Sequence, residues 1–136
     1  MKILRRVGAV IAGLIVAALL VEGAEAIVHL KHPFPPDMDH HDMAQIKKFV
    51  STLPADALVL VLAGWLLGTI AGTFIAAKIA GMRVPGYVLG ALLLAAGIVN
   101  SIVIPQPLWF SATSYVIYIV GTMIGVRWAV PRREAS

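Results

Sequence analysis

The sequence predicts an all-α membrane protein: a four-transmembrane-helix bundle with a short amphipathic interfacial helix in the first outer loop. Of the 136 residues, 60% are hydrophobic and only 13% are charged, and the mean hydropathy is +0.89. Soluble domains carry about 25% charged residues. Four apolar runs are each close to the ~20 residues that a helix needs to cross ~30 Å of hydrocarbon. We therefore expect one integral membrane domain over 1–136, too short to hold a soluble enzyme domain beside its spans.

The expected spans cover about 7–30, 57–79, 84–104 and 108–126. The first is apolar from Val7 to Val21 and reaches Leu30 only if its acidic residues are tolerated. The outer loop 31–56 separates the first two spans and is the only sizeable polar segment.

Basic residues indicate which side of the membrane each loop faces. If the helices alternate, eight of the eleven basic residues fall on one side: Lys2, Arg5, Arg6, Lys78, Arg83, Arg127, Arg132 and Arg133. Because Lys and Arg concentrate in cytoplasmic loops, we expect both termini to be cytoplasmic. These clusters lie beside apolar runs and are not interleaved with aromatic residues, so we expect the lipid bilayer as the partner and no nucleic acid.

The start of the chain allows a second interpretation. Basic residues, an apolar stretch and Ala24-Glu25-Ala26 resemble the three regions of a secretory signal with an A-x-A-like cleavage site. The apolar stretch is long for a signal and acidic residues crowd the site, so we favour an uncleaved span. Cleavage would leave three spans, with Ile27 at the outer end.

Small residues recur at intervals of four along three of the spans, a glycine-zipper pattern. They are Gly64, Gly68 and Gly72 in the second span, Gly86 and Gly90 in the third, and Gly121 and Gly125 in the fourth. Faces of this kind let neighbouring backbones approach closely, which favours helix association in lipid. We favour helix packing within one chain; a homodimer is the alternative that the spacing leaves open.

The outer loop predicts the short amphipathic helix. Asp39 is its expected N-cap. Its apolar face would carry Met43, Ile46, Phe49 and Val50. Such a helix is suited to lie on the membrane surface, with Lys47 and Lys48 turned to water or headgroups.

An acidic stripe marks the outer end of the first span. Glu22, Glu25 and His29 share one helical face, and Glu22 lies ~24 Å along the helix from Arg6. Intramembrane carboxylates usually face a bundle interior or a wet cavity. Polar residues expected at the same depth include Asn100, Ser114 and Tyr118. We expect a polar pocket open to the outer side, with Glu22 deepest and Glu25 and His29 at its mouth. The alternative is that Glu22 snorkels outward and merely fixes helix rotation.

The outer loop also holds residue types that bind metals. They are His32, Asp37, Asp39, His40, His41 and Asp42. Imidazoles and carboxylates bind zinc and other divalent ions, but this spacing matches no known metal signature. We expect no cofactor, and a divalent metal is the alternative. The chain has no cysteine, which excludes thiolate sites.

Several segments together resemble a group of small four-span bacterial inner-membrane proteins. They are the charged N-terminus, the E-x-x-E-x-x-x-H span end, the proline-rich outer loop, AGWLLGTIAG and the IPQPLWF turn. The resemblance covers nearly the whole chain. It implies a bacterial cytoplasmic membrane and carries over no catalytic residue.

These observations favour a multi-pass protein that is not an enzyme. The chain holds no G-x-S-x-G, H-E-x-x-H or phosphate-binding glycine loop. We expect an accessory or interaction protein, with a homo-oligomer or a larger membrane complex as its assembly. One alternative is an oligomeric transporter of a small cation or proton-coupled substrate that uses Glu22. A further alternative is a metal-dependent membrane enzyme with an outward-facing site.

Overall fold

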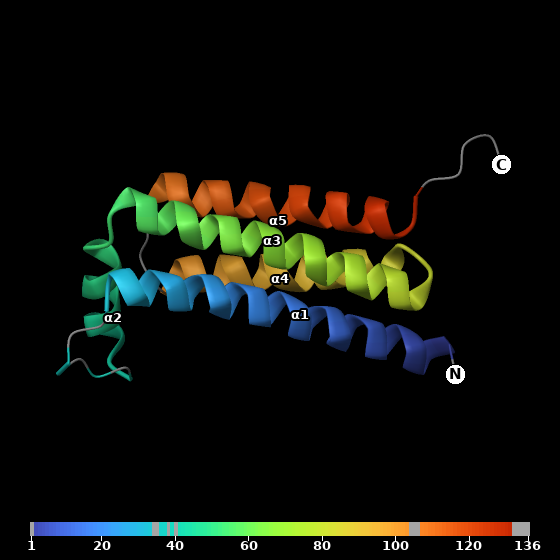
Figure 1. The fold of residues 1–136 in the computed structure, drawn as a ribbon, viewed down its shortest axis with the longest axis horizontal. Helices are drawn as coiled ribbons and strands as arrows, with labels where there is room; N and C mark the ends of the chain where they lie inside the picture. Colours follow the sequence, from blue (N-terminus) through green and yellow to red (C-terminus); the bar gives the residue numbers. More distant parts are fainter. Residues whose placement is uncertain (1, 34–35, 38, 40, 104–106, 132–136) are drawn as a thin grey trace.

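The computed structural model describes residues 2–33, 36–37, 39, 41–103 and 107–131. This part of the chain contains helices and no strands (Figure 1). The helices are α1 (Lys2–Lys31), α2 (Met43–Ser51), α3 (Ala55–Ala80), α4 (Val84–Val103) and α5 (Leu108–Ala129). The helices α1, α3, α4 and α5 are long and apolar enough to cross a membrane. The predicted all-α fold with four candidate membrane helices is therefore confirmed.

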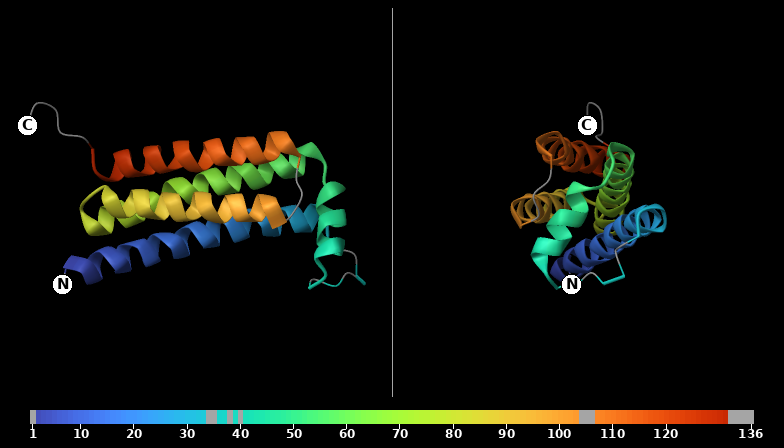
Figure 2. Two further views of the ribbon diagram at one scale, coloured as in Figure 1. Left: turned by 180° about the vertical axis from the view of Figure 1, so that it is seen from behind. Right: turned by 90° about the vertical axis from the view of Figure 1, so that its left-hand side faces the viewer.

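The four long helices run side by side in alternating directions, and α2 lies across one end of the bundle (Figure 1). Figure 2 shows α2 crossing in front of the bundle when it is viewed from that end. We call this end the α2 end. The start of α1, the α3–α4 turn and the end of α5 lie at the opposite end. The helices α3 and α4 each contact the other three long helices, and α3 makes the more extensive contacts.

At the opposite end, two arginines bind the final carbonyl groups of neighbouring helices. The Arg5 Nε donates to the Ile79 carbonyl at 2.7 Å, and the Arg83 Nε donates to the Val130 carbonyl at 2.9 Å. A cation is stabilising near a helix C-terminus, where the free carbonyl groups concentrate negative charge. The first helix extends beyond its expected span 7–30 to Lys2, and this extension places Arg5 beside the end of α3.

Small residues line both sides of the contact between α1 and α3. A Cβ added at Gly72 would lie 2.7 Å from the Gly13 carbonyl oxygen, and one added at Gly68 would lie 3.0 Å from that of Ala17. The buried residues of α1 form a row of their own: Ala9, Gly13, Ala17, Ala24 and Val28. The α1 row was not among the predicted packing residues. It leaves no room for larger side chains on the facing side of α3.

The other predicted packing glycines also face neighbouring helices. A Cβ added at Gly64 would meet α1, and one added at Gly86 would meet both α3 and α5. A Cβ added at Gly90 would meet α5, and one added at Gly121 or Gly125 would meet α3. All the predicted packing glycines therefore lie between helices of one chain.

In the half of the bundle away from α2, the contacts of α3 with its neighbours are closely packed. The hydroxyls of Thr69, Thr73 and Thr122 each donate to the carbonyl four residues earlier, at 2.7, 2.6 and 2.6 Å. Leu89 and Val126 are fully buried beside them. Because each buried threonine is satisfied within its own helix, these hydroxyls need no water or ligand.

The short helix α2 begins one turn later than predicted. Its N-cap is Asp42, not Asp39, and the Asp42 carboxylate accepts from the Ala44 N–H at 3.0 Å. The Gln45 amide also donates to Asp42, at 3.1 Å. Asp39 instead accepts from the His41 N–H at 2.9 Å. That short-range bond forms a turn, which holds Asp39 outside the helix.

Candidate functional site

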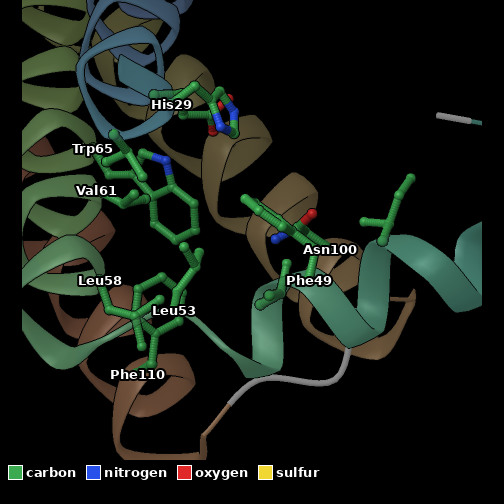
Figure 3. Close-up of a pocket in the computed structure, with 12 residues that line it drawn as sticks. His29, Phe49, Leu53, Leu58, Val61, Trp65, Asn100 and Phe110 are labelled. Atoms are coloured by element: carbon green, nitrogen blue, oxygen red, sulfur yellow. The ribbon is translucent and has the colours of Figure 1, made fainter. Parts of the chain in front are cut away.

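A cavity of about 180 Å³ lies between α2 and the bundle (Figure 3). Every helix contributes to its lining. From α1 come Glu25, Val28 and His29, and from α2 come Ile46, Phe49 and Val50. The remaining lining residues are Leu53, Leu58, Val61, Trp65, Asn100 and Phe110. The cavity is therefore a product of the tertiary structure, assembled from segments far apart in the sequence.

The helix α2 covers the cavity without a close backbone contact. Across the described residues, no Cα of α2 comes within 8 Å of a Cα in the four long helices. Side chains bridge this gap: the rings of His29 and Phe49 have centroids 6.1 Å apart. The predicted apolar face of α2 thus turns toward the cavity, and Lys47 and Lys48 are exposed. The side chain of Met43 lies outside the described residues.

Aromatic rings form one wall of the cavity. Trp65 meets Phe110 edge to face, with centroids 5.3 Å apart and an interplanar angle of 62°. Its ring also stacks on Tyr118 at 5.9 Å and 19°. Both arrangements are favoured by the ring quadrupoles. Figure 3 shows Trp65 beside Val61 on this wall. Because Trp65 is packed on two sides, its position is well defined.

The polar groups of the cavity are few. Among the described lining residues they are the Glu25 carboxylate, the His29 imidazole, the Asn100 amide and the Trp65 indole N–H. The Trp65 indole N–H, which is a donor only, lies beside the Glu25 carboxylate. Within the described part of the chain, no Lys or Arg lines the cavity. Glu25 lies ~9 Å along α1 from Lys31, the end of the helix.

Three predicted pocket residues, Glu25, His29 and Asn100, line the cavity. Glu22 does not line it and is exposed. On α1 the cavity is lined by Glu25, Val28 and His29, and Glu22 lies about one turn further from α2. The deepest acidic residue of the site is therefore Glu25, in the place where Glu22 was expected.

The predicted pocket residues of α5 also lie outside the cavity. Ser114 is buried, and its hydroxyl donates to the Ser111 carbonyl at 2.7 Å. Tyr118 covers the back of Trp65 and lines a second hollow of about 230 Å³ between α4 and α5. This second hollow is nearly all apolar and includes Tyr87 and Met123. Both α5 residues therefore help to pack the bundle.

The predicted metal ligands are not gathered into a site within the described residues. There, no group of three or more His, Asp or Glu residues could hold a metal ion. Asp39 and Asp42 use their carboxylates to order the turn and to cap α2. His32, Asp37 and His41 lie at or near the surface. His40 lies outside the described residues.

The sequence analysis did not identify the aromatic and apolar lining of the cavity. Trp65 and Phe110 were not singled out as site residues, and Ile46, Phe49 and Val50 were expected to face lipid. The sequence holds one indication that Trp65 is a site residue. It follows Gly64 directly and is a large ring in a span whose packing face is made of glycines.

The lining of the cavity is mostly apolar, with the few polar groups named above. An apolar surface with a few convergent polar groups is the usual make-up of a ligand site. No protein-family model matches the chain, and no curated protein or solved structure is significantly similar to it.

Proposed function

We propose that the protein is a non-enzymatic accessory or interaction protein of a bacterial inner membrane. It binds an apolar group of a ligand or partner in the cavity beneath α2. The observation that carries this proposal is the make-up of that cavity, which combines an apolar and aromatic wall with a few convergent polar groups. The second hollow, between α4 and α5, is nearly all apolar.

In this proposal the α2 end faces the outer side of the membrane. Six of the nine described basic residues lie at the opposite end: Lys2, Arg5, Arg6, Lys78, Arg83 and Arg127. Lys31, Lys47 and Lys48 lie at the α2 end. This majority suits a cytoplasmic location for the opposite end. The 30 residues of α1 span ~45 Å, more than the ~30 Å hydrocarbon layer. The cavity then lies near the outer boundary of the hydrocarbon, where a ligand can enter from water or from lipid.

The size of the cavity limits what it can hold. Its volume of about 180 Å³ slightly exceeds the ~150 Å³ of an apolar cavity that binds benzene. Drug-sized ligands occupy about 300–1,000 Å³. A single ring, a short branched alkyl group or one side chain of a partner is therefore the expected occupant.

A pair of matched substitutions tests this proposal. Val61 lines the cavity, whereas Val59, on the same helix, is 55% exposed on the outer surface. The full chain and both Val→Phe variants are purified in mild detergent, and bound proteins and small molecules are identified by mass spectrometry. We expect a bound species that persists in Val59→Phe and disappears in Val61→Phe. The proposal is wrong if Val61→Phe retains every species that the unaltered chain carries.

One observation favours a second candidate, an oligomeric transporter of a small cation. Glu22 is exposed on a membrane-length helix, where lone carboxylates are costly and often mark ion pathways. A second subunit would shield this carboxylate and could form a path with it. The test is pH-dependent cation flux into liposomes that contain the protein. This candidate requires flux that Glu22→Gln abolishes, and equal flux with and without the protein would rule it out.

A further inference from the structure

We infer that the cavity beneath α2 binds an organic ammonium cation with a small apolar body. The ammonium group lies against the carboxylate of Glu25, and the apolar body lies among the rings of Trp65, Phe110 and Phe49. This inference rests on the proposed function, because it names the ligand class of the same cavity.

The charge of the lining favours a cation. Glu25 contributes a carboxylate, and no described lining residue is Lys or Arg. A carboxylate next to apolar surface is costly unless it is paired or hydrogen-bonded. The indole N–H of Trp65 lies beside the Glu25 carboxylate, but a carboxylate has about four acceptor sites. An N⁺–H donor of a ligand would use the remaining sites, while an anion would be repelled.

The aromatic rings favour an organic cation over a metal ion. Trp65 and Phe110 lie 5.3 Å apart on one wall, and Phe49 approaches from α2. A cation within about 6 Å of such a ring is attracted by its negative face, and C–H groups beside the nitrogen pack on the same rings. A metal ion such as Ca²⁺ takes about 6–8 oxygen ligands. The described residues offer no cluster of that kind.

Two sources could supply the ammonium group. One is a free amine in the water outside the membrane, and the other is the ethanolamine headgroup of a membrane lipid. Both present a positively charged nitrogen next to apolar carbon. The test therefore uses a free amine as the probe and added lipid as the competitor.

The experiment compares two probes of similar shape on the full chain in uncharged maltoside micelles. Benzylamine is a cation at pH 7, and benzyl alcohol is neutral. Binding is measured by isothermal titration calorimetry against empty micelles. Hydrogen bonds between charged groups are stronger than those of neutral groups, so we expect benzylamine to bind at least tenfold more tightly than benzyl alcohol. The Glu25→Gln variant should bind both probes equally, whereas Glu22→Gln should keep the preference.

The lipid arm identifies the source. If the headgroup is the ligand, added phosphatidylethanolamine weakens benzylamine binding and added phosphatidylglycerol does not. If a free amine is the ligand, neither lipid competes. Circular dichroism and thermal melting show that each variant is folded. The comparison of the two probes on the unaltered chain does not depend on any variant.

Equal affinity for both probes on the unaltered chain would overturn the ammonium assignment and leave the proposed function standing. A preference for benzylamine that survives Glu25→Gln would also overturn it. If neither probe binds the folded chain, the inference fails. The proposed function is then judged by the Val61→Phe comparison alone.

Discussion

Replacing Gly72 by Ala should destabilise the bundle, although alanine is the better helix former. The new Cβ would lie 2.7 Å from the Gly13 carbonyl oxygen and 2.9 Å from the Ala17 Cβ. Both distances are shorter than real Cβ contacts, and the first obstacle is backbone that cannot rotate away. To relieve the contact, α1 and α3 would have to move apart along their closest contact.

Gly23→Ala is the matched control. Gly23 also lies in a membrane-length helix, and an added Cβ there meets nothing within 4 Å. Both variants gain the same advantage in helix propensity, up to about 1 kcal/mol. The difference between them therefore isolates the packing cost, which for an overfilled site is about 1–3 kcal/mol. We expect Gly72→Ala to be less stable than Gly23→Ala by about 2 kcal/mol.

The assay is the free energy of unfolding of the full chain in mixed micelles, titrated with a denaturing detergent and followed by circular dichroism. Equal stability of the two variants would refute the reasoning, because it would mean that α1 and α3 are not packed backbone to backbone at Gly72.

Two further outcomes follow from local hydrogen bonds. Asp42→Ala should cost about 1 kcal/mol of helix stability through the lost N-cap, seen as faster hydrogen exchange over 43–51. Asp37→Ala should leave exchange unchanged, and equal effects of the two variants would contradict the cap assignment. The hydroxyls of Ser101 and Tyr115 hydrogen-bond between α4 and α5. A double-mutant cycle with Ser101→Ala and Tyr115→Phe should give a coupling of about 0.6 kcal/mol, and additive effects would exclude this bond.

The long helices could be predicted from the sequence because apolar length alone identifies them. Their predicted ends lie within a few residues of the observed ends, apart from the start of α1. That helix continues to Lys2, where the Arg5 side chain reaches the carbonyl of Ile79. The start of α2 was misplaced because Asp39 and Asp42 both have side chains suited to a cap, and only the local hydrogen bonds decide between them.

The site could be predicted only in part. Counting residues along each span places Glu25, His29 and Asn100 at one end of the bundle, and they do meet there. Counting does not give the rotation of a helix. A membrane helix is apolar on its lipid-facing and its packed faces, so polarity does not reveal which face is buried. For this reason Ser114 and Tyr118 were placed in a cavity that their side chains do not line.

The central claim, a cavity at the α2 end open to the outer side, can be tested by cysteine labelling. The chain has no native cysteine, so single cysteines can be introduced at Asn100, which lines the cavity, and at Thr73, which is fully buried. Intact cells are treated with a membrane-impermeant maleimide. We predict that Asn100→Cys is labelled and that benzylamine slows its labelling, whereas Thr73→Cys is not labelled. The account would be contradicted if maleimide added to intact cells does not label Asn100→Cys, or labels it only after the membrane is opened.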